Sequence, residues 1–261
     1  MKLAAYRLMV VTWARAFTAY RFDTIFRLLV PAIQILMLIE LWNAVYGGRD
    51  VVAGMPPRAT MLAYLTVINI QTWVTRTIIH GDIPQRISEG GVATDLLRPM
   101  PFPGQMVAKQ AGFTLGQLPI FAISLVLAMA VGLISLPVSF LYVPSLLLGC
   151  VVGTLVALLL GYVSFWTLET EGALWAYGMI SAFFAGAYIP LDLLPDVVRP
   201  IFHALPFQAM GYTPVAIYTG LLGGEAMWRA LAVQVGWIVV LVPLAALVWR
   251  RAALRVTVQG G

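Results

Sequence analysis

Long apolar segments are the feature of this sequence that most limits its fold. About 20 helical residues are needed to cross a hydrocarbon core of about 30 Å, and several segments of the chain meet or approach that length. They are approximately Thr24–Tyr46, Thr60–His80, Ala111–Ile134, Phe140–Thr167, Ala173–Pro190 and Leu231–Trp249. The sequence therefore predicts an all-α, polytopic membrane protein with six transmembrane helices.

The composition supports a surface that faces lipid. The chain has 261 residues, of which 61% are hydrophobic and 10% are charged, whereas about 25% of a soluble domain is charged. So few charges cannot cover a water-facing surface of this size. The net charge of +5 could suggest nucleic acid, but the basic residues flank apolar segments. We therefore expect the lipid bilayer, and no nucleic acid, among the partners.

The first residues predict a separate amphipathic helix. Apolar side chains recur at alternating steps of three and four, while Arg7 and Arg15 project elsewhere; the apolar residues are Leu3, Tyr6, Val10, Trp13, Phe17 and Tyr20. This pattern is typical of a helix lying in the membrane interface. A signal peptide fits less well, because no small-residue cleavage site precedes the first span. We expect an interfacial helix over 1–23 and one six-span domain over 24–261.

The basic residues predict the orientation of the spans. They concentrate before the first span, between the second and third, and after the sixth: Lys2, Arg7, Arg15, Arg21, Arg27, then Arg86, Arg98, Lys109, then Arg250, Arg251, Arg255. The remaining loops carry fewer. Because cytoplasmic loops are enriched in Lys and Arg, we expect the multi-pass chain to lie in the cell (cytoplasmic) membrane with both termini and the loop 81–110 in the cytoplasm.

The segment 191–230 is broken by prolines that forbid one straight helix. Within it, Phe207–Leu222 is apolar but only about 16 residues long, which suits a re-entrant helix better than a crossing. We expect two short helices dipping into the outer leaflet, with Pro195 in the first turn of one. A full crossing stays open.

Several motifs are missing. Lys2 and Lys109 are the only lysines, and neither lies in a Gly-rich phosphate loop, so the chain has no nucleotide site of its own. His80 and His203 lie far apart, no HExxH occurs, and the single Cys150 falls in an apolar stretch. We predict no enzyme activity in this chain, no cofactor and no metal site.

The second predicted span carries polar residues on one face. They recur at steps of three and four: Thr66, Asn69, Trp73, Arg76 and His80. A charged side chain facing lipid is costly, so this face should meet protein or water. Two interpretations stay open: a lining of a translocation path formed by Thr66, Asn69, Trp73 and Arg76, or interhelical hydrogen bonding with Arg76 reaching the inner interface.

Two further segments have a recognisable pattern. In the cytoplasmic loop, Ile83 and Ile87 are four apart and predict a short helix with one apolar face, which could dock on a partner or serve as a solvated connector. In the fifth span, Gly178, Ala182 and Gly186 form a ridge of small residues, typical of close helix packing within a chain or between subunits.

Two segments resemble a known family. The stretch Ile87–Pro99, ending Asp-Leu-Leu-Arg-Pro, resembles the cytoplasmic loop of ABC type-2 exporter permeases. Within that family it is most similar to a branch whose members have six spans. The stretch Ala185–Pro195, continuing through Leu205-Pro206-Phe207 to Pro214 and Gly220, is similar to that family's exit from span five and re-entrant region. With the amphipathic start and the order of spans, the resemblance covers essentially the whole chain.

The resemblance implies an exporter subunit that works with partners. These would be cytoplasmic ABC ATPase subunits and a second permease, identical or a sister chain. The N-terminal helix would be the connecting helix, and spans two and five would line the path. Coupling to the ATPase would involve Arg86, Ile87, Glu89, Asp95, Leu96, Leu97 and Arg98, and the outer gate would involve Pro190, Pro195, Pro206 and Phe207. The predicted lining of Thr, Asn and aromatic residues with few charges suits an amphipathic or hydrophobic small molecule or a lipid, and a glycan stays open.

Two other function classes compete with this one. A secondary carrier would need an internal coupling site and commonly shows repeat symmetry, yet Glu40, Glu169 and Glu171 all lie away from the centres of the spans. An intramembrane enzyme would need convergent catalytic groups, and the two histidines are predicted on opposite sides of the membrane.

Overall fold

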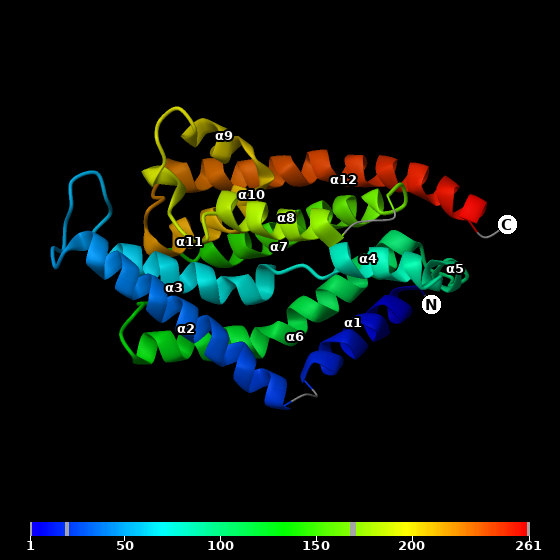
Figure 1. Cartoon of the computed structure of the whole chain (residues 1–261), viewed down its shortest axis with the longest axis horizontal. Helices are drawn as coiled ribbons and strands as arrows, with labels where there is room; N and C mark the ends of the chain where they lie inside the picture. Colours follow the sequence, from blue (N-terminus) through cyan, green and yellow to red (C-terminus); the bar gives the residue numbers. More distant parts are fainter. Residues whose placement is uncertain (1, 19–20, 168–170, 260–261) are drawn as a thin grey trace.

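The computed structural model describes residues 2–18, 21–167 and 171–259, with side chains described over 3–16, 28–167 and 172–255. Every regular element in these ranges is helical, which confirms the predicted all-α class, and the helices form a bundle elongated along one axis (Figure 1). In chain order they are α1 (Lys2–Thr18), α2 (Arg21–Tyr46), α3 (Arg58–Thr75), α4 (Ile79–Ser88), α5 (Gly91–Leu96), α6 (Phe102–Ala130), α7 (Tyr142–Val163), α8 (Glu171–Phe184), the short 3-10 helix η1 (Leu191–Leu193), α9 (Arg199–Ala204), α10 (Pro206–Met210), α11 (Tyr212–Thr219) and α12 (Glu225–Gln259).

Four helices of the described chain are long and apolar enough to cross a membrane. They are Leu28–Tyr46 of α2, Phe102–Ala130, Tyr142–Val163 and Glu225–Arg255 of α12. The other two predicted spans correspond to α3, with 18 residues, and α8, with 14 residues. At 1.5 Å per residue α8 covers roughly 21 Å, less than the hydrocarbon core of about 30 Å.

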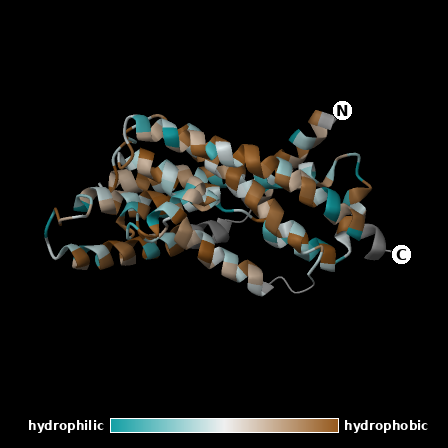
Figure 2. Cartoon of the chain, turned by 90° about the horizontal axis from the view of Figure 1, so that it is seen from above, coloured by the Kyte–Doolittle hydropathy of each residue, from teal (hydrophilic) through white to brown (hydrophobic). Residues whose placement is uncertain are grey.

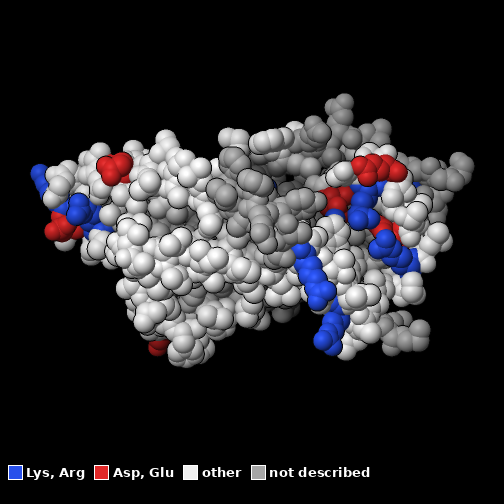
Figure 3. Space-filling model, turned by 90° about the horizontal axis from the view of Figure 1, so that it is seen from below, with Lys and Arg blue, Asp and Glu red and all other residues white. Residues whose placement is uncertain are grey.

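Charged side chains gather toward the two ends of the bundle. On the face that Figure 3 shows, a broad belt without charge separates them, and hydrophobic residues predominate along the helices in Figure 2. The end that carries α4 and α5 also holds the start of α1 and the end of α12 (Figure 1). An uncharged belt between charged ends is the arrangement expected where the middle of a bundle faces hydrocarbon.

The α3 helix ends at Thr75, so the prediction of one span reaching His80 was wrong. Arg76 has φ −58° and ψ 135°, an extended conformation that stops the helix. Gln110 of α6 compensates for the break: its Nε2 donates to the Arg76 carbonyl at 3.0 Å, and its Oε1 accepts from the Ile78 N–H at 2.9 Å. Because buried backbone groups must be paired, these two bonds allow the chain to turn into α4.

Glycines on α7 let broken segments contact its backbone. A Cβ at Gly149 would lie 2.8 Å from the Ala209 carbonyl oxygen, and one at Gly161 would lie 2.6 Å from Cδ1 of Ile83. Within the bundle α7 buries 56% of its apolar window, whereas α2 buries 17%. The α7 helix is therefore the central one, and its missing side chains make room for α4 and for the end of α10.

The α1 helix packs along the first half of α6. A Cβ at Gly112 would lie 2.6 Å from the Val10 carbonyl oxygen and 2.7 Å from Cβ of Trp13, and one at Gly104 would meet the Tyr6 hydroxyl. Part of the predicted apolar face of α1 thus lies against protein.

The rest of that face is only partly described. Leu3 is 84% exposed, and Phe17 and Tyr20 lie outside the described side chains. The predicted division between 1–23 and 24–261 falls inside α2, which begins at Arg21.

Short helices connect α8 to α12. Pro200 and Pro206 lie in the first turns of α9 and α10, where a missing N–H costs least. Pro195 precedes α9, and its carbonyl accepts from the N–H groups of Val198 and Arg199, each at 3.0 Å. The prediction that Pro195 lies in a first turn was therefore wrong, because Pro200 takes that place.

Glutamines also hold the junction between α10 and α11. Gln71 Nε2 donates to the carbonyls of Met210 and Gly211, both at 3.2 Å. Gln234 Nε2 donates to the Ala209 carbonyl at 2.7 Å. Carbonyls freed where α10 ends are thus paired by side chains from α3 and α12.

Replacing Gln110 should loosen the linker between α3 and α4. In Gln110→Leu the Arg76 carbonyl and the Ile78 N–H lose their buried partner, and each unpaired group costs about 1–3 kcal/mol. We expect a clear fall in the free energy of unfolding in detergent, with faster hydrogen exchange at Ile78. The control Gln85→Leu, at an exposed position of α4, should change neither. Unaltered exchange at Ile78 in Gln110→Leu would contradict this role.

Candidate functional site

A cavity of about 920 Å³ lies between α3 and α8. Its walls are the second half of α3, the linker to α4, the start of α4, one side of α8 with the turn after it, and the junction of α10 with α11. The lining residues are Ile68, Gln71, Thr72, Thr75, Arg76, Thr77, Ile78, His80, Leu174, Trp175, Tyr177, Gly178, Met179, Ser181, Ala182, Ala185, Ala187, Tyr188, Met210 and Gly211. Pockets of roughly 300–1,000 Å³ suit drug-sized ligands, so a small organic molecule would fit.

The cavity includes one of the four residues predicted to line a path. Arg76 lines it, whereas Thr66, Asn69 and Trp73 are not among the lining residues. The Thr66 hydroxyl and the Asn69 amide each donate to a carbonyl of their own helix, at 2.8 Å. The α3 side chains that do line it, such as Thr72, belong to the neighbouring face of the helix.

The α8 helix supplies much of the lining. The family resemblance predicted that span five lines a path but indicated no residues there. Gly178 and Ala182 of the small-residue ridge both line the cavity, and a Cβ at Gly178 would meet nothing within 4 Å. The ridge therefore widens the cavity at this point. Gly186, past the end of α8, packs instead against the Tyr64 hydroxyl, which donates to its carbonyl at 2.8 Å.

The positively charged guanidinium of Arg76 and the titratable imidazole of His80 lie at one end of the cavity. The Arg76 side chain is exposed, although its carbonyl is held by Gln110. His80 Nδ1 lies 3.2 Å from Thr77 Oγ1, and its ring meets the edge of the Tyr177 ring at 5.5 Å between centroids. Burial, and then the positive charge of Arg76, lower the pKa of His80, which favours its neutral form near pH 7.

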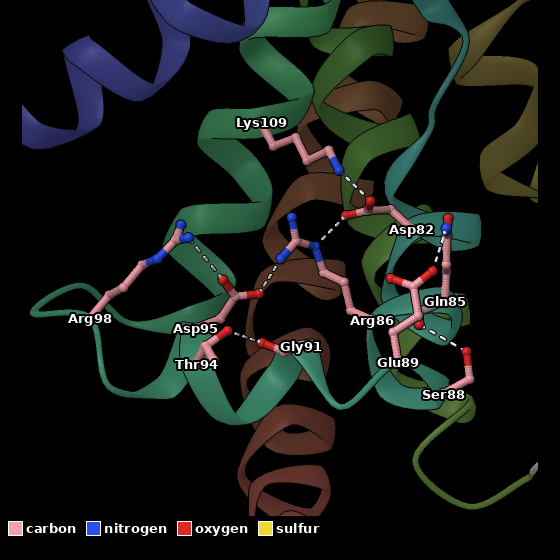
Figure 4. Close-up of polar contacts among 10 residues, drawn as sticks. All are labelled: Asp82, Gln85, Arg86, Ser88, Glu89, Gly91, Thr94, Asp95, Arg98 and Lys109. Atoms are coloured by element: carbon pink, nitrogen blue, oxygen red, sulfur yellow. Dashed lines mark hydrogen bonds and ion pairs between the residues drawn. The ribbon is translucent and has the colours of Figure 1, made fainter.

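A network of charged side chains joins α4, α5 and α6 (Figure 4). Lys109 Nζ donates to Asp82 Oδ1, and Arg86 Nε donates to Asp82 Oδ2 at 3.0 Å. Arg86 Nη1 donates to Asp95 Oδ2 at 2.5 Å, and Arg98 Nη2 lies 3.5 Å from Asp95 Oδ1. The side chains of Lys109 and Asp95 are 4% and 1% exposed, so the Lys109–Asp82 and Arg86–Asp95 pairs are largely shielded from water, whereas Arg98 is exposed.

The network also reaches α1. Lys109 Nζ lies 4.1 Å from the centroid of the Trp13 ring, a cation–π contact. Burial lowers the pKa of Arg86, but Asp82 and Asp95 raise it by more, so on balance it is raised. Arg86 therefore stays charged and holds both carboxylates, which fixes α5 against α4.

The residues predicted to couple to an ATPase differ in exposure. Glu89, Leu96, Leu97 and Arg98 are exposed, Arg86 and Asp95 are paired within the chain, and Ile87 packs against a buried cluster. Leu97 is 87% exposed. Gln105 Nε2 donates to the carbonyls of Asp95 and Met100, at 2.7 and 2.9 Å, and so holds the turn that presents Leu97.

The residues predicted to form an outer gate lie in the segment between α8 and α11. Pro190 precedes η1, Pro195 starts the turn before α9, and Pro206 begins α10. The Phe207 ring lies 5.9 Å from the ring of Phe184, centroid to centroid, and so packs on α8. None of these four is among the described residues that line the cavity.

Polar contacts that the sequence did not indicate lie in the same region. The Tyr212 hydroxyl donates to Asp192 Oδ2, and His203 Nε2 lies 3.8 Å from Asp192 Oδ1. His203 Nδ1 lies 3.0 Å from Gln208 Oε1. These contacts join η1, α9, α10 and α11 to one another. A Pro-rich segment with few polar residues provides no spacing from which such pairs could be predicted.

The family model described as ABC-2 family transporter protein matches residues 28–260. The chain belongs to the ABC-2 transporter family. Members of this family are membrane transport subunits, which agrees with the apolar helices and with the resemblance found in the sequence. A search among curated proteins found no match.

Among the side chains in the described ranges, no group of three or more His, Cys, Asp or Glu is placed to hold a metal ion. The ABC-2 chain instead offers a cavity for a ligand and, at one end, a helical segment held by ion pairs.

The buried ion pair between α4 and α6 can be tested by substitution. Asp82→Asn leaves the buried Lys109 ammonium without a carboxylate, and removing one partner of a buried pair costs about 3–5 kcal/mol. Because Asp82 is 18% exposed, we expect a loss of about 2–4 kcal/mol in unfolding free energy, measured by denaturant titration in one detergent. Lys109→Met should cost less, since Arg86 still pairs with Asp82.

A matched control lies at the other end of the bundle. Asp50 pairs with Arg58 at 3.4 Å, but its side chain is 87% exposed. Asp50→Asn should therefore change the unfolding free energy by about 0–1 kcal/mol. Equal effects of Asp82→Asn and Asp50→Asn would show that the network contributes no more than a surface pair.

Proposed function

We propose that this chain is the permease subunit of an ATP-driven ABC exporter. It forms half of a dimeric translocation path with a second permease, identical or a sister chain, and works with separate cytoplasmic ATP-binding subunits. One observation carries the proposal: α4 connects the cavity to an exposed apolar turn. His80 in its first turn lines the cavity, and its other end leads through α5 to Leu97, which is 87% exposed.

The helices and their charges support one membrane topology. Six spans would be α2, α3, α6, α7, α8 and α12, with both termini and the segment α4–α5 in the cytoplasm of the cell membrane, as the basic residues favour. The short α8 and the polar α3 flank the cavity, so they border protein and water more than lipid. The helices from η1 to α11 would then form the re-entrant region near the outer leaflet, with Pro190, Pro195, Pro206 and Phe207 at the gate.

The contacts of α4 support a mechanical role. An ATPase subunit would bind the exposed residues Glu89, Leu96, Leu97 and Arg98, while Arg86 and Asp95 keep that surface in place. Closure of two ATPase subunits would push α4, and its contacts with Gly161 of α7 and Lys109 of α6 would carry the movement into the bundle. The linker at Arg76, which holds one end of the cavity, would move with it.

The lining supports an amphipathic or hydrophobic cargo. Trp175, Tyr177 and Met179 provide apolar and aromatic surface along α8, and Thr72 and Thr75 provide hydroxyls along α3. Pockets of this mixed kind suit drug-like molecules or lipids. A secondary carrier that works without ATP is the alternative, and it predicts a chain without an ATPase partner.

Co-purification tests the partnership with an ATPase. A tagged chain purified from its native membrane should bring down a stoichiometric ATP-binding subunit with ATP hydrolysis. Leu97→Asp should abolish this association by placing a charge in an apolar contact. Leu136→Asp, a change at a leucine that is 75% exposed at the opposite end, should retain it.

Two outcomes would count against the proposal. A folded chain that purifies alone, with no ATPase activity, would favour the secondary carrier. Full association of the Leu97→Asp variant would remove the turn after α5 from the contact.

Filling the cavity should block transport without harming the fold. Gly178→Leu places a side chain in open space on α8, so we expect transport in vesicles to fall by about tenfold or more while the melting temperature stays within a few degrees. Gly236→Leu on α12, where a Cβ also meets nothing within 4 Å, is the matched control. Normal transport by Gly178→Leu would place the path elsewhere.

A further inference from the structure

The charged groups of the cavity lie at one end of it. Arg76 is at the end of α3 and His80 in the first turn of α4, while α8 contributes Leu174, Trp175 and Met179 along the opposite wall. Trp175 and Met179 are 78% and 74% exposed, so they present apolar surface to any occupant. The cavity therefore has a cationic end and an apolar wall.

Arg76 is the strongest hydrogen-bond donor in the lining. No hydrogen bond or ion pair joins its guanidinium to another described side chain, and its backbone is held by Thr72 and Gln110. The hydroxyls of Thr72 and Thr75 donate to carbonyls of their own helix, at 3.0 and 3.3 Å. These hydroxyl protons are therefore donated within α3, whereas the N–H groups of the Arg76 guanidinium can donate to a ligand.

The lining contains no acidic side chain among the described residues. A guanidinium binds carboxylates and phosphates through paired, charge-assisted hydrogen bonds. Without a neighbouring carboxylate, a cationic head group would be repelled by Arg76, and a neutral one would leave the charge unpaired. Glu169 and Glu171, which precede this wall, lie outside the described side chains.

We propose that the cavity binds an amphipathic anion, with a carboxylate or phosphate head group at Arg76 and an apolar body along α8. His80 would add a second donor to the same head group when its ring carries a proton on the nitrogen that faces it. The inference rests on the proposed function, since it defines the class of cargo that the same cavity would carry. The proposed function leaves the charge of an amphipathic cargo open, and this inference makes that charge negative.

The test uses the permease alone, in nanodiscs of zwitterionic phosphatidylcholine. A dodecanoate bearing a diazirine is photo-crosslinked to it, and mass spectrometry locates the labelled peptide. Dodecanoate, dodecyl phosphate, dodecyltrimethylammonium and dodecyl maltoside then compete. We expect saturable labelling of α8 that is displaced by the two anions and by neither of the others. The stronger of the two anions distinguishes a carboxylate site from a phosphate site.

Variants separate the head-group contact from general membrane binding. Arg76→Gln should weaken displacement by the anions about tenfold, because the head group loses its charge-assisted hydrogen bonds to the guanidinium, and Arg76→Lys should retain part of the effect. Arg250→Gln, an exposed arginine of α12 outside the cavity, should behave as the unmodified chain does.

Two results would overturn the proposal. Equal displacement by dodecyltrimethylammonium would show that the site does not prefer an anionic head group, as would be the case if an acidic side chain neutralised Arg76. Unchanged affinity in Arg76→Gln would remove Arg76 from the site. The labelling test contains no ATPase subunit, so its result does not depend on the co-purification test. If the anions bind here but no ATPase co-purifies from the native membrane, the exporter proposal fails and the anion site stands.

Discussion

The pairing of backbone groups where helices break is the constraint on which this structure depends. Inside an apolar bundle, water cannot satisfy a free carbonyl or N–H, so each break needs a side chain to pair with it. Gln110 does this between α3 and α4, and Gln71 and Gln234 do it where α10 ends. The cavity lies between these two breaks. Both of its boundaries, the linker at Arg76 and the junction at Gly211, exist because an amide from another helix supports them.

The second organising interaction is the ion-pair network at the end of the bundle. Buried charges are costly unless paired, and here Lys109, Asp82, Arg86 and Asp95 form ion pairs with one another across three helices. The consequence is a rigid α4–α5 segment whose apolar residue Leu97 is left outside. In the proposed function this segment is the part that a partner would contact, and α4 links it to the cavity wall.

The sequence predicted the class of fold and the positions of the long apolar helices, because apolar length and basic flanks are local signals. Their ends were predicted less well: the predicted spans begin nine residues after the start of α6 and end ten residues before the end of α12. The sequence missed the break at Arg76, since Thr-Arg-Thr-Ile contains neither Pro nor Gly and the compensating amide lies 34 residues away. It did not indicate that Arg86 and Asp95 pair with each other, because they lie nine residues apart on two separate short helices. Which face of α3 lines the cavity could not be predicted either, because both faces carry threonines and only the position of α8 decides.

The start of α1 and the end of α12 lie at the same end of the bundle, together with α4 and α5 (Figure 1). A polypeptide linker between two copies would therefore never have to cross the bilayer. Two permeases could be joined in one gene with a short hydrophilic connector, which fixes their stoichiometry. A tandem chain of this kind would allow a single altered half to be studied beside an intact one, a form of asymmetry that separate identical subunits cannot provide.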